Sequence, residues 1–128
     1  MAITSAICNS FKQEVLQAIH NFTASSGNTF NLALYTSSAT LNKSTTAYTT
    51  SNEISNTSGS AYTAKGKALT SVTSASFTAN GCLIFNDSAS GDPAVCAIAF
   101  GSDKTVTSGT FTIQFPTADA SNAIIRIA

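Results

Sequence analysis

Charged side chains are scarce in this 128-residue chain: only 9% of its residues are Asp, Glu, Lys or Arg, and the six basic residues balance the six acidic ones. Soluble proteins usually contain about 25% charged residues. A protein that binds nucleic acid through phosphate needs an excess of Lys and Arg, so we expect no nucleic-acid partner. No apolar run approaches the about 18 residues of a membrane-spanning helix, so we expect no membrane partner.

The residues that carry most catalytic and metal chemistry are also few. His20 is the single histidine, and we expect it on a helix surface, in contact with solvent. Without a second histidine or a nearby cysteine pair, it has no partners for a metal ion. The Gly-x-Ser-x-Gly, Gly-x-Gly-x-x-Gly and Walker motifs are missing. The sequence therefore predicts a protein that is not an enzyme and that has neither a metal nor a cofactor.

The three cysteines, Cys8, Cys82 and Cys96, are widely spaced. An odd number without short spacings is a poor disulfide framework and a poor zinc site. Cys82 and Cys96 lie in neighbouring apolar segments where they could meet across a hairpin, so their pairing stays open. We expect all three to be small buried hydrophobic residues. The segment between them, 86–93, carries Asp87 and Asp92 but lacks the calcium-loop pattern, so we expect a hydrophilic hairpin turn there.

Serine and threonine supply most of the polar surface, with 19 residues of each and ten asparagines. The chain therefore presents hydroxyl and amide groups where most proteins present charges. Leu, Ile, Val and Phe together number 28, which is enough for a small core. The length supports one domain, 1–128, with one core.

Helical periodicity is confined to residues 5–22. Apolar residues recur there every three or four positions, as on one face of a helix, and Ser5 can cap the start. The stripe consists of Ile7, Phe11, Val15, Ile19 and Phe22. We expect it to pack on the rest of the domain or on a second chain.

The remainder, 29–128, has the pattern of a β-sandwich. Residues 30–35 alternate as a half-buried strand does, and 81–85 and 94–100 are apolar on both faces, as central strands are. Residues typical of turns at 101–104 separate segment 94–100 from an amphipathic strand at 110–115. The apolar end 123–128 predicts a paired, buried terminal strand. With a strand at 62–73, we expect a mainly β fold: a sandwich or barrel of about six to seven strands with one N-terminal helix.

The long polar segment 36–60 is the largest candidate surface for binding a partner, because loops on β scaffolds usually carry binding. Tyr48 and Ile54 are its expected anchors, although both could instead pin the segment to its own core. Glu53 is expected to pair with Lys65 or Lys67, or to accept backbone N–H groups.

Two further residues are candidates for contact with a partner. Tyr62 is an aromatic residue expected to be exposed. Arg126 stands between isoleucines on the expected last strand, either at a sheet edge with its stem on apolar surface or as an anchor for a neighbouring subunit.

Several segments together resemble a family of small structural proteins of tailed bacteriophages, over nearly the whole chain. They are ICNSFKQE at 7–14, FNLALYT at 30–36, NE at 52–53, AYTAKG at 61–66, GCLIFN at 81–86 and FTIQFP at 111–116. The resemblance implies a virion structural protein, assembled in the host cytoplasm, and no catalytic residues. By this resemblance, the protein would sit on the head as a decoration (cement) protein or on the tail.

We therefore expect a capsid decoration protein whose partner is the major capsid protein or another virion structural protein. A neutral, hydroxyl-rich surface is easier to desolvate than an ionic one, and shell symmetry favours a homodimer or homotrimer. The alternative is a tail or fibre component, or an adhesin-like binding module that recognises a host surface. A fibre usually shows repeats and a glycan-binding module usually shows exposed aromatic residues; here there is no repeat and no tryptophan.

Overall fold

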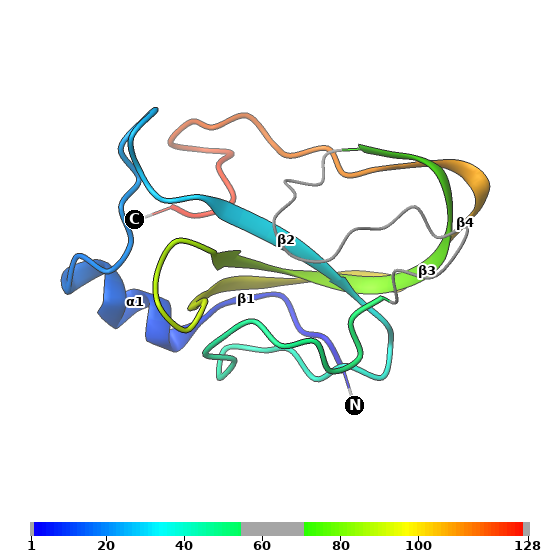
Figure 1. Cartoon of the computed structure of the whole chain (residues 1–128), viewed down its shortest axis with the longest axis horizontal. Helices are drawn as coiled ribbons and strands as arrows, with labels where there is room; N and C mark the ends of the chain where they lie inside the picture. Colours follow the sequence, from blue (N-terminus) through cyan, green and yellow to red (C-terminus); the bar gives the residue numbers. More distant parts are fainter. Residues whose placement is uncertain (1, 55–70, 127–128) are drawn as a thin grey trace.

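The computed structural model describes residues 2–54 and 71–126. These residues form a mainly β fold with one open, fully antiparallel sheet of four strands and a single short helix (Figure 1). The spatial order of the strands is β1-β4-β3-β2. The elements are β1 (Ala6–Ile7), α1 (Asn9–Leu16), β2 (Phe30–Tyr35), β3 (Ser71–Asn86) and β4 (Ala94–Thr112).

The hairpin of β3 and β4 dominates the sheet, with a register that runs from Phe85 opposite Ala94 to Ser71 opposite Thr112. Its turn confirms the hydrophilic hairpin expected at 86–93. The Asn86 side-chain oxygen accepts the backbone N–H groups of Ser88 and Ala89, at 3.0 and 3.2 Å. These bonds hold the first half of the turn.

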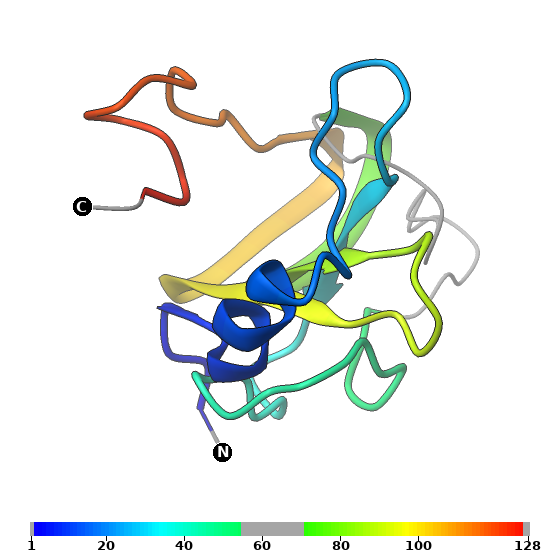
Figure 2. The ribbon, with the colours of Figure 1, turned by 90° about the vertical axis from the view of Figure 1, so that its left-hand side faces the viewer.

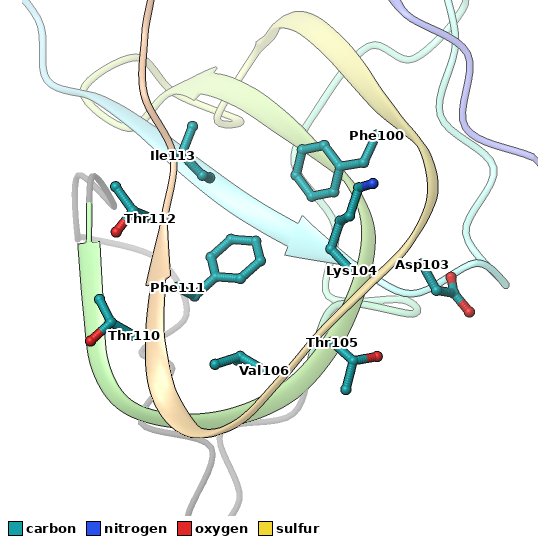
Figure 3. Close-up of a pocket in the computed structure, with 9 residues that line it drawn as sticks. All are labelled: Phe100, Asp103, Lys104, Thr105, Val106, Thr110, Phe111, Thr112 and Ile113. Atoms are coloured by element: carbon teal, nitrogen blue, oxygen red, sulfur yellow. The ribbon is translucent and has the colours of Figure 1, made fainter.

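The expected number of strands is not confirmed, because β3 and β4 are longer than the sequence predicts. The predicted break at 101–104 lies inside β4, where Gly101 adopts a φ of 82° and the strand continues. Four register shifts interrupt the pairing of β3 with β4, and such bulges bend a strand without ending it. The hairpin consequently curls over at its far end (Figures 1 and 3), and the described residues form one open sheet, so neither a sandwich nor a barrel is confirmed.

The predicted helix 5–22 is too long at both ends. At the start, Ala6 and Ile7 pair with Ala97 and Cys96 of β4, so this segment is a strand and Ser5 does not cap the helix. At the end, Ala18 adopts a φ of 58°, which no α-helix can continue. Between these points the prediction is confirmed, because Phe11 is buried and Val15 packs against the same core.

Both faces of the sheet are covered. Alternate residues of β2 and β3 form two clusters: Ala33, Tyr35, Leu83 and Phe85 belong to the one beneath α1, and Leu32, Leu34 and Cys82 to the other. The expected half-buried character of 30–35 is therefore wrong, since every residue from Asn31 to Tyr35 is buried. All three cysteines are buried and free, as small hydrophobic residues.

The C-terminal segment that follows β4 is not the predicted buried strand. Residues 113–126 form turns and irregular backbone, and the Asp119 carboxylate accepts the backbone N–H groups of Ser121 and Asn122. These side-chain bonds give the backbone an alternative to strand pairing. Figure 2 shows the segment looping away from the far end of β4.

Candidate interaction surface

Three of the predicted partner-binding residues hold segment 36–54 on the domain: Tyr48 contacts Glu53 and one core cluster, and Ile54 belongs to the other. The Tyr48 hydroxyl donates to Glu53 Oε2 at 2.6 Å, and its ring stacks on Phe85 with centroids 4.5 Å apart. Ile54 is buried, and its N–H donates to the Leu34 carbonyl at 2.9 Å. Burial and the Glu53 carboxylate raise the pKa of Tyr48 above its usual range.

These contacts give each of the three residues a role inside the domain. Tyr48 and Ile54 pin their segment to its own core, one of the two alternatives that the sequence leaves open. Glu53 accepts a side-chain hydroxyl, which the sequence did not predict, and Lys65, Lys67 and Tyr62 lie outside the described residues. A partner role for Tyr48, Glu53, Ile54 and Tyr62 stays a prediction.

Arg126 lies on irregular backbone and not on a strand edge. Its side chain is exposed, and one guanidinium nitrogen donates to the Ser121 carbonyl at 2.6 Å. The remaining N–H groups of the guanidinium are available to an acceptor outside the domain. Its possible role as an anchor for a neighbouring chain stays a prediction.

The prediction for His20 is wrong, because its side chain is buried and forms the centre of a hydrogen-bonded cluster. Nε2 lies 2.7 Å from Glu14 Oε2, and Nδ1 lies 3.1 Å from Asn86 Nδ2. The ring also packs against Phe11, with centroids 4.9 Å apart, and is stacked near Phe22 and Phe30. The chain folds back after Ala18, and this places His20 beneath its own helix and not on its surface.

Large apolar side chains are exposed at the C-terminal end of α1 and in the segment that follows it. Leu16 is 88% exposed, Phe22 58% and Ile19 41%. Phe22 is held flat against Phe30, with centroids 4.7 Å apart and an angle of 5° between the rings. We refer to Leu16, Ile19 and Phe22 as the exposed apolar residues. Ile19 and Phe22 belong to the apolar stripe that was expected to pack on the domain or on a second chain, but they lie beyond the end of the helix, and Leu16 lies off that stripe.

A groove of about 430 Å³ lies between α1 and the C-terminal segment, and of the exposed apolar residues Leu16 lines it. Among the described residues that line it, the charged ones are both basic, Lys12 and Arg126, and none carries a carboxylate. The lining residues are Ile7, Phe11, Lys12, Val15, Leu16, Ile125 and Arg126. Sequence reasoning missed this groove, because its two walls are more than a hundred residues apart along the chain.

A second cavity, of about 590 Å³, lies on the concave side of the curled hairpin. Figure 3 shows the rings of Phe100 and Phe111 pointing into it, with threonine side chains and the Asp103 and Lys104 side chains along the strands. The two charged groups are engaged within the hairpin: Asn80 donates to Asp103 at 2.9 Å, and Lys104 donates to Ser102 at 3.1 Å.

The described residues contain no cluster of three or more His, Cys, Asp or Glu side chains that could hold a metal ion. Burial raises the pKa of the Cys8 thiol to about 11 and that of Cys82 and Cys96 to about 12, which disfavours a reactive thiolate at each. Within residues 2–54 and 71–126, no helix has the length and apolarity needed to span a bilayer.

Comparison of the chain with protein-family models, with curated proteins and with solved structures finds no match. The surfaces described above are therefore interpreted from their own geometry and chemistry.

Proposed function

We propose that this protein is a non-enzymatic structural protein of a tailed-phage virion, attached to the head shell as a decoration (cement) protein. The observation that carries the proposal is the surface around α1. Three large apolar side chains, Leu16, Ile19 and Phe22, are exposed at or after the end of α1 on a chain with few charges, and Leu16 also lines an apolar groove. Exposed apolar patches of this kind mark protein interaction sites. The resemblance to small phage structural proteins supplies the virion context.

Attachment to a shell uses these features in a simple way. A decoration protein stabilises the shell by adding buried area between neighbouring subunits. The same site is repeated many times on a symmetric particle, so a modest affinity for each copy is sufficient when contacts are multivalent. The partner in this proposal is the major capsid protein or another virion structural protein, and the bound form is a homodimer or homotrimer.

The test is the copy number of the protein in purified particles of the phage that encodes it, measured by quantitative mass spectrometry against the major capsid protein. A shell decoration should be present in hundreds of copies. A gene deletion should leave particles that assemble but lose their DNA at a lower temperature. Absence of the protein from particles would overturn a virion role, and a handful of copies would overturn the placement on the shell.

One observation favours the alternative of an adhesin-like tail or fibre module. The cavity of the curled hairpin exposes the rings of Phe100 and Phe111 beside threonine hydroxyls, a combination that can stack on and hydrogen-bond to a sugar (Figure 3). A glycan array probed with the full chain distinguishes the two functions. Glycan binding that is lost in Phe100→Ala but retained in Leu16→Ser would support the adhesin-like function. The absence of binding to any glycan on the array would contradict it.

A further inference from the structure

We propose that the groove between α1 and the C-terminal segment is a docking site for a partner-protein segment that presents a large aliphatic side chain beside a carboxylate. This inference deepens the proposed function, because it names the surface of attachment and the chemistry of its partner. It rests on the proposed function only in taking that partner to be part of a virion.

The shape of the groove suits an aliphatic side chain. Its walls are formed by Phe11 and Val15 of α1 and by Ile125 of the C-terminal segment, with Leu16 on its rim. Its volume of about 430 Å³ lies within the range of about 300–1,000 Å³ that is common for binding pockets. An aliphatic side chain inserted there would lose its contact with water and would cover apolar atoms of the groove that are otherwise exposed to solvent.

The charges of the groove specify the second feature of the partner. Lys12 and Arg126 both line it. Lys12 forms no ion pair among the described residues, and the nearest acidic residue along the helix, Glu14, is held by His20 at 2.7 Å. Among the described residues, a carboxylate on the partner would meet two cations and no anion, so charge complementarity favours an acidic segment over a basic one.

The same charges disfavour a second copy of this chain as the occupant. Two copies related by a two-fold axis present the same surface patch to each other. On this face each copy would bring its Lys12 and Arg126 toward those of its mate, and juxtaposed like charges oppose association. We therefore assign the groove to a different chain, and a two-fold homodimer of the protein would use another face.

The α1 wall of the groove is held in place before a partner arrives. The Phe11 ring packs against the buried His20 ring at 4.9 Å, and His20 is in turn hydrogen-bonded to Glu14 and Asn86. These contacts hold α1 in one orientation on the hairpin, so docking does not require the helix to be ordered first. Such preorganisation increases affinity for a given contact area.

The inference can be tested with short peptides that share one pattern of leucines and differ only in the flanking residues, which are Glu, Gln or Lys. Binding is measured by NMR on the full, isotope-labelled chain. We expect the Leu/Glu peptide to shift the amide signals of Lys12, Leu16 and Arg126. It should bind about threefold to tenfold more tightly than the Leu/Gln peptide, the range expected for one or two exposed ion pairs. The Leu/Lys peptide should bind more weakly than both.

Two variants and one control test whether residues of the groove bind the peptides. Lys12→Gln should reduce the preference for Glu over Gln by about twofold to fivefold, as the loss of one exposed ion pair predicts. The matched control is Lys43→Gln, which removes a lysine from segment 36–54, outside the groove, and should leave the preference unchanged. Leu16→Ser should weaken all three peptides without unfolding the chain, because Leu16 is 88% exposed.

Equal binding of the three peptides, shifts confined to other parts of the chain, or no shift at millimolar peptide would each overturn the inference. Self-association that Leu16→Ser abolishes would overturn it too, in favour of a second copy. The peptide assay uses no particles, so its failure is distinguishable from a failure of the proposed function, which the copy number in virions decides.

Discussion

His20 Nδ1 lies 3.1 Å from Asn86 Nδ2, and this contact joins the segment after α1 to the turn of the main hairpin. The direction of the hydrogen bond follows from the other partners of Asn86. Its side-chain oxygen accepts two backbone N–H groups in the turn, so its nitrogen is the donor, toward both His20 and Asn28. His20 Nδ1 must then be unprotonated, and Nε2–H donates to Glu14. One buried amide thus orients a histidine, a helix and a turn.

We predict that Asn86→Ala is strongly destabilising. The Asn86 side chain is fully buried and makes four hydrogen bonds, so its removal leaves the buried His20 Nδ1 without this partner and breaks three partly buried hydrogen bonds. The free energy of unfolding should fall by about 2–4 kcal/mol. The measurement is the urea midpoint. Asn80→Ala is the matched control, since Asn80 makes one exposed hydrogen bond, to Asp103, and should cost less than about 1 kcal/mol. Equal losses in the two variants would contradict the prediction.

Phe11 and Leu16 should respond very differently to truncation, although they lie on the same helix. Phe11 is 5% exposed and belongs to the larger core cluster, whereas Leu16 is 88% exposed. Phe11→Ala should therefore lower the free energy of unfolding by about 3–5 kcal/mol. Leu16→Ala should change it by less than about 0.5 kcal/mol. Thermal unfolding of the two variants checks both values, and an unchanged stability of Phe11→Ala would show that α1 does not pack as described.

The three thiols should be unreactive toward iodoacetamide in the folded protein at about pH 8, and reactive after unfolding in urea. Burial raises the pKa of Cys8 to about 11 and that of Cys82 and Cys96 to about 12, so almost none of the thiolate form exists in the fold at neutral pH. Mass spectrometry after brief alkylation counts the modified residues. Rapid modification of any one of them in the native protein would show that its site opens readily.

The same pKa values predict that stability falls in alkali. The unfolded chain releases its thiol protons near about pH 8.5, while the folded chain retains them to higher pH. Between these limits the unfolded state binds fewer protons, so the free energy of unfolding decreases as pH rises. It should be constant below about pH 8 and decline from about pH 9. Urea midpoints measured across this interval check the sign, and a constant midpoint to high pH would contradict it.

The contact of Tyr48 with Glu53 should be measurable as a coupling energy. The two side chains are joined by a hydrogen bond of 2.6 Å, so Tyr48→Phe, which removes the donor, and Glu53→Ala, which removes the acceptor, each abolish the same interaction. Their effects on the free energy of unfolding should be non-additive by about 1 kcal/mol. A double-mutant cycle in urea tests this, with Tyr48→Phe retaining the ring that stacks on Phe85. Strictly additive losses would mean that the bond contributes nothing to holding segment 36–54.

The strand segments with continuous apolar runs were the most predictable part of the fold. Residues 81–85 and 94–100 lie in strands, because runs of that kind are stable only when both faces are covered, and residues 30–35 lie in a strand as their alternation predicted. The burial of Phe11 also followed from its helical spacing. In each of these cases the local pattern and the tertiary structure require the same conformation.

The errors occurred where tertiary contacts override local patterns. The stripe that includes Ile7 continues a helical period, yet Ile7 pairs with Cys96 of β4 because an edge of the sheet is available to it. His20 looked like a surface residue because Glu14 and Asn86, its partners, can be identified only once the chain has folded. The groove could not be predicted at all, because Lys12 and Arg126 come from opposite ends of the sequence.

The pairing of β1 with β4 has a consequence for the order in which the chain folds. Ala6 has its strand partner in Ala97, whereas Phe85 finds Ala94 across a short turn. Contacts that are close in sequence form first, because they close smaller loops. On a ribosome, the N-terminal strand must therefore wait, unpaired, until most of the chain has been synthesised. We expect hydrogen exchange to be slowest near the hairpin turn and fastest at Ala6 and Ile7, the strand that docks last.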